Sequence, residues 1–137
     1  MYKYIMNNKY RKTKTTVSMI NYHFIFCPRY RRKIFLIEGV EERFKELVNK
    51  ISKEMNLEII ALECDIDHVH LFVNANPTVS PSKIMHQLKG VTSKTIREEF
   101  NKLNRMPSLW TRSYFVSTAG EVSSETVKKY VENQKKR

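Results

Sequence analysis

The sequence predicts one α+β domain in which two helices cover one face of an antiparallel four-stranded sheet. Three observations favour this class. The chain has 137 residues, a length that suits a single domain. Short segments rich in β-branched and aromatic residues alternate with longer segments in which apolar residues recur at helical spacing. Glycine and proline are scarce, at three and four residues, which excludes collagen-like and low-complexity chains.

The first half of the chain predicts a strand, a helix and a second strand. Residues 16–27 are rich in β-branched and aromatic side chains, as a central strand requires. Residues 40–55 predict a helix, because apolar residues recur along one stripe and Glu41 and Glu42 lie in the first turn, where acidic side chains stabilise a helix. Residues 57–63 predict the second strand.

A hairpin and a second helix follow. Residues 65–67 predict a turn, and residues 68–74 predict a third strand that pairs with the second. Ser80 and Pro81 suit a helix start, since a serine oxygen accepts a backbone N–H at the N-cap and proline fits the first helical position. This helix is expected to end before Pro107.

The C-terminal part predicts a fourth strand over residues 109–117 and, after the Ala119-Gly120 break, a last helix. Ser123 caps that helix, and one stripe of it carries Val127, Tyr130, Val131 and Gln134. The first six elements follow the split βαβ order of ferredoxin-like (RRM-like) domains. In that arrangement the sheet face opposite the two helices stays available for a ligand.

Charge is distributed unevenly along the chain. It has 25 Lys and Arg residues against 14 Asp and Glu residues, a net charge of +11. Residues 38–67 hold nine of the acidic residues and only four basic ones, so the remainder is strongly basic. Such a surface suits a polyanion, most often nucleic acid; the competing interpretation is a basic protein with solvated faces.

The pair His68 and His70 is the first candidate for chemistry. Residues two apart on a strand project from the same face, so both imidazoles point together while Val69 faces the helices. Two adjacent imidazoles can bind one divalent metal. His-x-His also occurs by chance, and two partly buried, hydrogen-bonded histidines are the competing interpretation.

Tyr130 and Gln134 are the second candidate pair. They lie four residues apart on the predicted last helix and therefore share one of its faces. The competing interpretation is a tyrosine packed in the core and a solvated glutamine.

Taken together, these features resemble the single-tyrosine HUH transposases, the small TnpA-type transposases of bacterial and archaeal insertion sequences. The resemblance covers roughly residues 17–135 and excludes the basic N-terminal segment. It rests on six ordered matches: Tyr22 to Phe26 followed by Arg29 to Arg32, Asp67 to Leu71, Leu88 to Ser93, Trp110, Ser113 to Val116, and Tyr130 with Gln134. Where the family has a lysine before the Tyr-Arg pair, this chain has Arg29, which keeps the charge.

The resemblance implies a role for each matching residue. Tyr130 falls on the nucleophile of the family. His68, His70 and Gln134 fall on its metal ligands, which bind a divalent ion, usually Mg²⁺ or Mn²⁺. A ferredoxin-like fold is also implied, in agreement with the order of the elements.

The implied activity is the cutting and rejoining of single-stranded DNA at the ends of an insertion sequence. A metal on a phosphate oxygen neutralises charge, and a phenolic oxygen displaces the 3′-oxygen to form a covalent 5′-phosphotyrosine. Members of the family recognise DNA hairpins and act as homodimers, with Tyr130 of one subunit expected to complete the histidine site of the other.

The expected DNA contacts come from two basic stretches. The candidates for phosphate contacts are Arg29, Arg31, Arg32, Lys33, Lys83 and Lys89, and Tyr30 could stack on a base. A solvated basic face is the competing interpretation for each. Two other functions remain open: a related HUH nuclease that acts on chromosomal repeats, and a ferredoxin-like nucleic-acid-binding module without enzyme activity.

The remaining features concern other ligands and location. His23 could line the histidine face of the sheet or simply pack, and Cys27 and Cys64 could form a structural zinc site with the histidine pair. Two cysteines cannot form a disulfide scaffold, so a DNA-associated cytoplasmic protein is expected. No apolar run approaches the roughly 20 residues of a membrane span, and no secretory signal opens the chain. Residues 1–14 predict a basic arm, and residues 15–137 the single transposase domain.

Overall fold

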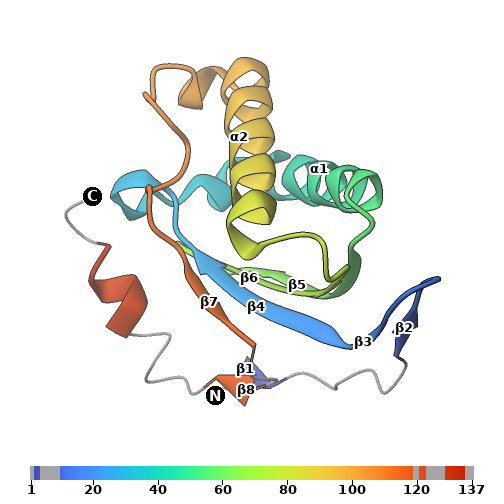
Figure 1. The fold of residues 1–137 in the computed structure, drawn as a ribbon. Coiled ribbons are helices and arrows are strands. Elements are labelled where there is room, and N and C mark those ends of the chain that lie inside the picture. The colour runs from blue at the N-terminus through green and yellow to red at the C-terminus, as the bar shows by residue number, and fades with distance from the viewer. Residues whose placement is uncertain (1, 4–9, 119–120, 123–128, 135–137) are drawn as a thin grey trace.

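A computed structural model describes residues 2–3, 10–118, 121–122 and 129–134. Its main sheet has four antiparallel strands in the spatial order β5-β6-β4-β7 (Figure 1). Their bounds are β4 (Ile20–Phe26), β5 (Glu58–Cys64), β6 (Val69–Ala75) and β7 (Phe115–Ser117). The first and third of these strands along the chain are central and the other two form the edges, as the split βαβ arrangement requires. The predicted ferredoxin-like fold is confirmed.

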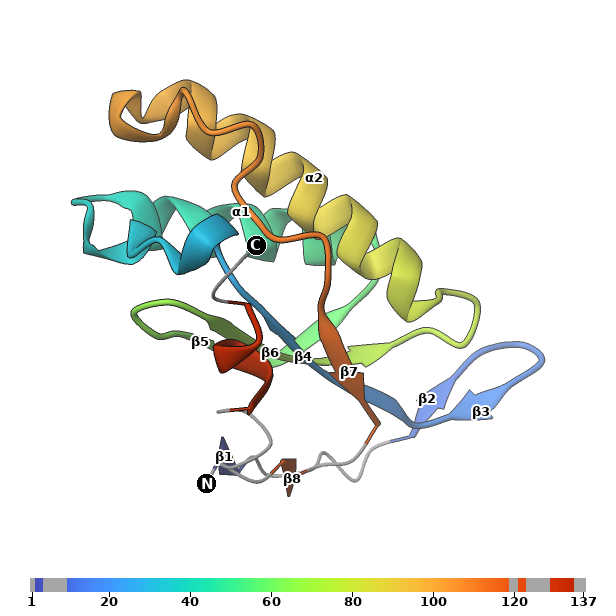
Figure 2. The same ribbon diagram turned by 90° about the vertical axis from the view of Figure 1, so that its left-hand side faces the viewer.

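Two helices, α1 (Val40–Glu54) and α2 (Pro81–Glu99), cover one face of this sheet (Figures 1 and 2). The predicted start of α2 is confirmed, because the Ser80 side chain accepts a hydrogen bond from the Lys83 backbone N–H and Pro81 is the first helical residue. Alternate residues of the central strands face the helices and form the core with them: Phe24, Phe26, Val69, Leu71 and Val73.

The predicted fourth strand was wrong over residues 109–114, where the chain takes an irregular path before β7. Trp110 explains the difference. Its ring is buried against Phe26 and Phe44 at centroid distances of 4.9 and 5.4 Å, and its indole N–H donates to Thr92 Oγ1 at 2.9 Å. Around this anchor the segment still makes an isolated bridge between Pro28 and Trp110, with hydrogen bonds from Arg29 N–H to the Leu109 carbonyl and from Thr111 N–H to the Cys27 carbonyl, but the regular ladder with β4 is interrupted before β7.

Two other boundaries also differ from the prediction. The first strand was expected over residues 16–27, but β3 (Val17–Ser18) pairs with β2 (Arg11–Lys12) and the central strand β4 begins only at Ile20. The second helix was expected to carry its apolar stripe as far as Leu103, but it ends at Glu99, and Leu103 is buried by the short 3₁₀ helix η3 (Asn101–Leu103).

The N-terminal residues that the structure describes are paired with the rest of the chain. β1 (Tyr2–Lys3) forms a two-stranded antiparallel sheet with β8 (Glu121–Val122). Farther along, the Arg11 guanidinium donates to the Asn74 side chain at 2.8 and 3.0 Å and to the Asn56 carbonyl at 3.1 Å. The division into an arm of residues 1–14 and a domain of residues 15–137 stays a prediction.

The C-terminal residues lie against the sheet face opposite the two helices (Figures 1 and 2). Residues 129–132 are helical, and Val131 is buried against Ile25, Cys27 and Phe115. The predicted cap at Ser123, the Ala119-Gly120 break and Val127 lie outside the described residues. Within the described part of the chain, no helix combines the length and apolar character needed to cross a bilayer.

Candidate active site

The β4–β6 pairing places a group of histidines on the sheet face that the helices leave free. His70 pairs with Ile25 in the register and His23 with Phe72, so both imidazoles project from the face against which Val131 packs. His23 Nε2 lies 3.2 Å from His70 Nδ1, and the His23 ring stacks on Phe72 at 4.0 Å. His23 therefore both packs and lines the histidine face, as the sequence had left open.

The potential metal ligands converge at the start of β6. One ligand atom each from Asp65, His68 and His70 lies within 4.8 Å of the others. Asp65 Oδ2 is 2.9 Å from His68 Nε2 and 3.5 Å from His70 Nε2. Two imidazoles and a carboxylate at this spacing fit a divalent ion, with positions left for substrate or water. The sequence analysis did not identify Asp65 as a possible metal ligand. Its position in a tight turn, three residues before His68, could have indicated this role.

Burial keeps two of the histidines neutral. Loss of solvent, followed by the nearby His68, lowers the pKa of His70 from 6.5 to about 4. Burial and then the nearby His70 lower the pKa of His23 to about 4 as well. Because metal ions bind the deprotonated imidazole, these residues need no proton removed at neutral pH.

A second carboxylate stands behind His68. Asp67 Oδ1 lies 2.9 Å from His68 Nδ1, and Asp67 Oδ2 accepts from Arg31 Nη2 at 2.6 Å and from Arg31 Nε at 3.0 Å. Burial alone would raise the pKa of Asp67, but the hydrogen bonds from His68 and Arg31 outweigh it and the pKa lies below its ordinary value. Asp67 is therefore ionised, with one oxygen hydrogen-bonded to Arg31 and the other facing His68.

Tyr130 and Gln134 meet at Ser113, on the segment that leads into β7. Ser113 Oγ donates to Gln134 Oε1 at 2.9 Å and lies 3.4 Å from the Tyr130 hydroxyl oxygen. The Gln134 side chain is buried, so the idea of a solvated glutamine was wrong. Ser113 belongs to a matched segment, but nothing in its type indicated this contact. Gln134 as a metal ligand and Tyr130 as the nucleophile stay predictions.

The basic run after β4 divides into different environments. Arg29 donates to Ser108 Oγ at 3.0 Å and lies over the Tyr30 ring at 5.5 Å. Tyr30 is 58% exposed, and Arg32 and Lys33 are exposed as well. Arg31 turns inward to Asp67. Of the run, Tyr30, Arg32 and Lys33 are therefore the side chains most accessible to DNA.

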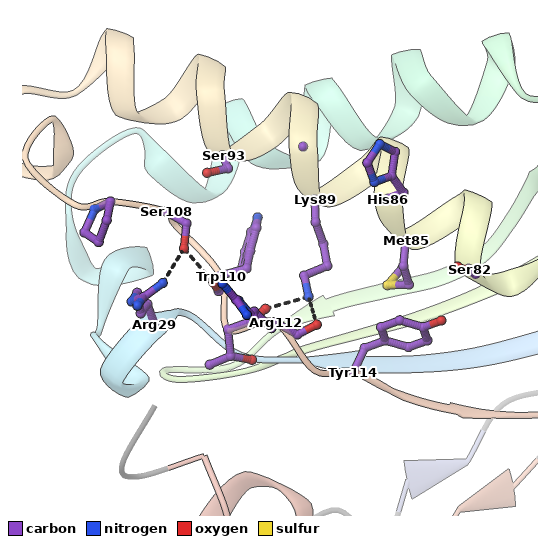
Figure 3. Close-up of a pocket in the computed structure, with 13 residues that line it drawn as sticks. Arg29, Ser82, Met85, His86, Lys89, Ser93, Ser108, Trp110, Arg112 and Tyr114 are labelled. Carbon is purple, nitrogen blue, oxygen red and sulfur yellow. Dashed lines mark hydrogen bonds between the residues drawn. The ribbon is translucent and has the colours of Figure 1, made fainter.

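A pocket of about 550 Å³ lies between α2 and the segment that precedes β7 (Figure 3). It is lined by Arg29, Ser82, Met85, His86, Lys89, Gly90, Ser93, Pro107, Ser108, Trp110, Thr111, Arg112 and Tyr114, without an acidic residue. The positive side chains of this lining suit an anionic ligand.

The two candidate lysines of α2 differ sharply. Lys83 is exposed. Lys89 Nζ donates to the carbonyl oxygens of Thr111 and Arg112 at 2.6 and 3.3 Å (Figure 3). It also donates to the Ser113 carbonyl at 3.2 Å, and burial lowers its pKa to about 8. Lys89 thus holds the irregular segment that carries Ser113.

The zinc hypothesis gains no support from the described residues. Cys27 and Cys64 are both free, and neither belongs to the Asp65–His68–His70 group. Burial raises the pKa of each thiol to about 12, whereas zinc binds the thiolate.

Comparison with known sequences identifies relatives of this chain. A family described as "Transposase IS200 like" matches residues 16–134. The transposase of insertion sequence element IS200 from Salmonella typhimurium is 32% identical over 116 residues, which cover 82% of this chain and 75% of the relative. The ISDra2 transposase TnpA of Deinococcus radiodurans is 29% identical over 127 residues, which cover 90% of each chain.

Solved structures show the same relationship. A Deinococcus radiodurans crystal structure described as a transposase has a TM-score of 0.82 at 30% identity, over 90% of this chain and 97% of that one. A REP-associated tyrosine transposase bound to a REP hairpin shares the fold, with a TM-score of 0.50 at 12% identity over 89% and 68% of the two chains. With a family match over residues 16–134 and relatives of this similarity, the chain belongs to the IS200-like transposases.

Proposed function

We propose that this transposase cuts and rejoins single-stranded DNA at the ends of an insertion sequence, through a covalent link to Tyr130 and with the help of a divalent metal. One observation carries the proposal. The ligand atoms of Asp65, His68 and His70 converge within 4.8 Å at the sheet face on which the Tyr130 segment is packed through Val131. A nucleic-acid-binding module without enzyme activity has no need of such a group.

His68 and His70 would hold the ion, with Asp65 as an oxygen ligand and Gln134 as a further candidate. When bound, Mg²⁺ or Mn²⁺ neutralises charge on a phosphodiester and orients its phosphorus. Oxygen ligands suit these ions, which makes the Asp65 carboxylate a better match than the two imidazoles alone. The rigid β4–β6 pair keeps the histidines in place.

Tyr130 supplies the nucleophile. Its phenolic O–H releases a proton to solvent and the oxygen forms a bond to phosphorus, while the bond from phosphorus to the 3′-oxygen breaks and the 3′-oxygen takes up a proton to leave as a hydroxyl. The product is a 5′-phosphotyrosine. Because one phosphodiester replaces another, a later 3′-hydroxyl can reverse the step without an external energy source.

The proposed substrate is a single strand that carries a hairpin. The support is the basic, partly exposed run Tyr30 to Lys33, the positive pocket beside α2, and the REP hairpin bound by a structural neighbour. We further propose a cytoplasmic homodimer in which Tyr130 of one subunit completes the metal site of the other. The Tyr130 segment docks on the sheet face through side chains such as Val131 and Gln134, a mode of contact that is compatible with exchange between identical subunits.

Replacing Tyr130 with Phe tests the nucleophile. The change removes only the hydroxyl, so we expect folding and hairpin binding to persist while cleavage and the covalent adduct disappear. The measurement is denaturing electrophoresis of protein incubated with labelled single-stranded DNA from the element's ends. Adduct formation by the Phe variant would refute the assignment.

Replacing His70 with Ala tests the metal site. We expect the variant to bind Mn²⁺ at least tenfold more weakly and to lose cleavage, because a ligand is gone, while hairpin affinity stays the same. His86→Ala, which changes an exposed histidine of α2, is the matched control and should keep wild-type Mn²⁺ affinity. Full cleavage by wild-type protein after removal of all divalent metal by a chelator would contradict metal assistance.

The lysines of α2 give a matched pair for DNA binding and stability. Lys83→Ala should reduce the salt dependence of single-strand affinity by about 0.7 in log–log slope, the contribution of one phosphate contact, with stability unchanged. Lys89→Ala removes the lysine donor from the carbonyl oxygens of Thr111, Arg112 and Ser113, of which Ser113 keeps the Thr111 hydroxyl as a donor, so we expect the free energy of unfolding to fall by about 2 kcal/mol in urea titrations. Equal stability losses for both variants would contradict this distinction.

Mixing two inactive variants tests the shared site. Tyr130→Phe keeps the histidines and His68→Ala keeps the tyrosine, so a mixed dimer with shared sites has one complete site and should form the adduct again. Two affinity tags establish that mixed dimers are present. If they are present and no adduct forms, each site is built within one chain.

A further inference from the structure

We propose that Arg31 and Asp67 are positioning residues for the metal site, and that they hold the His68 imidazole with its Nε2 atom toward the ion. Arg31 then acts through Asp67 and is not mainly a phosphate contact. This inference rests on the proposed function, because it presupposes a divalent ion at His68 and His70.

The contacts join three partly buried side chains in a row, Arg31, Asp67 and His68. Arg31 donates through two nitrogens to one oxygen of Asp67, and the other oxygen of Asp67 faces His68 Nδ1 at 2.9 Å. The exposed fractions of the three side chains are 25%, 14% and 16%. Both nitrogens of His68 face a carboxylate oxygen at 2.9 Å, Nδ1 that of Asp67 and Nε2 that of Asp65, but only Asp67 is fixed by Arg31. When Nε2 binds a metal in place of Asp65, Nδ1 keeps the proton that it donates to Asp67. Such outer partners fix the tautomer and orientation of metal-binding histidines.

Asp65 shows why the two carboxylates near His68 have different roles. Asp65 Oδ2 faces the Nε2 atoms of both His68 and His70, on the side where an ion would bind, and its side chain is 52% exposed. Nε2 can exchange its contact with Asp65 for a divalent ion. The Nδ1 atom of His68 keeps its contact with Asp67, because Arg31 binds the other oxygen of Asp67 and holds the carboxylate in place.

The backbone around Arg31 supports the same conclusion. Tyr30 and Arg31 both adopt left-handed conformations, with φ of 59° and 52°. Residues with a β-carbon are strained in this region, and such strain is concentrated at functional sites. A flexible arginine that only reaches for a phosphate needs no such bend. Here the bend follows β4 and directs Arg31 to the turn before the neighbouring strand β6.

Electrostatics and positioning predict opposite effects for the loss of Arg31. If Arg31 influenced the ion only through its charge, removing that charge would reduce repulsion and strengthen binding of a divalent cation. If Arg31 holds Asp67 and thereby His68, removing it should weaken binding, by about 10- to 100-fold as is typical for such outer partners.

The test is calorimetric Mn²⁺ affinity, measured without DNA, for wild type and four variants. We expect Arg31→Gln and Asp67→Asn to bind Mn²⁺ about 10- to 100-fold more weakly. Arg31→Lys, which keeps the charge but not the two-nitrogen contact, should lie between Arg31→Gln and wild type. Arg32→Gln removes a neighbouring exposed charge and should bind Mn²⁺ as wild type does, or slightly more tightly. Cooperative thermal unfolding of each variant shows that it is folded.

The outcomes separate this inference from the proposed function. Wild type that binds Mn²⁺ and an Arg31→Gln variant that binds it equally or more tightly would overturn the positioning role and leave the metal site intact. An Arg31→Gln variant that loses affinity for DNA but keeps its affinity for Mn²⁺ would also overturn the positioning role. Wild type that binds no Mn²⁺ would overturn the metal site, and the inference with it. If Arg31→Gln does not fold, the folded Asp67→Asn and Arg31→Lys variants decide by the same criterion.

Discussion

The pairing of β4 with β6 is the constraint on which both the core and the site depend. Seven residue pairs, from Ile20 with Ala75 to Phe26 with Val69, set the register. Because side chains alternate across a strand, this register sends Phe24 and Leu71 toward the helices and His23 and His70 to the opposite face. A slip by one residue would turn the imidazoles toward the helices and the apolar core residues toward the opposite face. Stability and chemistry therefore select the same register.

Much of this arrangement could be predicted from the sequence, because it depends on local periodicity. Alternation and helical spacing located the sheet and both helices, and the serine–proline start of α2 was confirmed. The fourth strand was wrong in its first half, because the burial of Trp110 under α2 is a long-range effect that no local pattern of residues 109–114 reveals. The buried position of Gln134 depends in the same way on a distant residue, Ser113.

Charge was the least informative signal at the level of single residues. Arg29 to Lys33 form one basic run in the sequence, yet Arg31 is bound to Asp67 while Arg32 and Lys33 are exposed. Lys83 and Lys89 lie on the same helix. Lys83 is exposed, whereas Lys89 donates hydrogen bonds to backbone carbonyls. Composition records how many positive charges a chain has. Which of them remain accessible depends on acceptors that folding brings near, and Asp67 and the carbonyls of residues 111–113 lie far away in sequence.

The way in which residues 129–134 are attached has a consequence for the proposed reaction. They form a helical turn docked through side chains on the sheet face, whereas His70 belongs to a ladder of seven residue pairs between β4 and β6. A docked helical turn can move as a unit while the sheet stays closed. The proposed nucleophile therefore lies on an element that can be displaced without opening the sheet, and His70 lies on one that cannot.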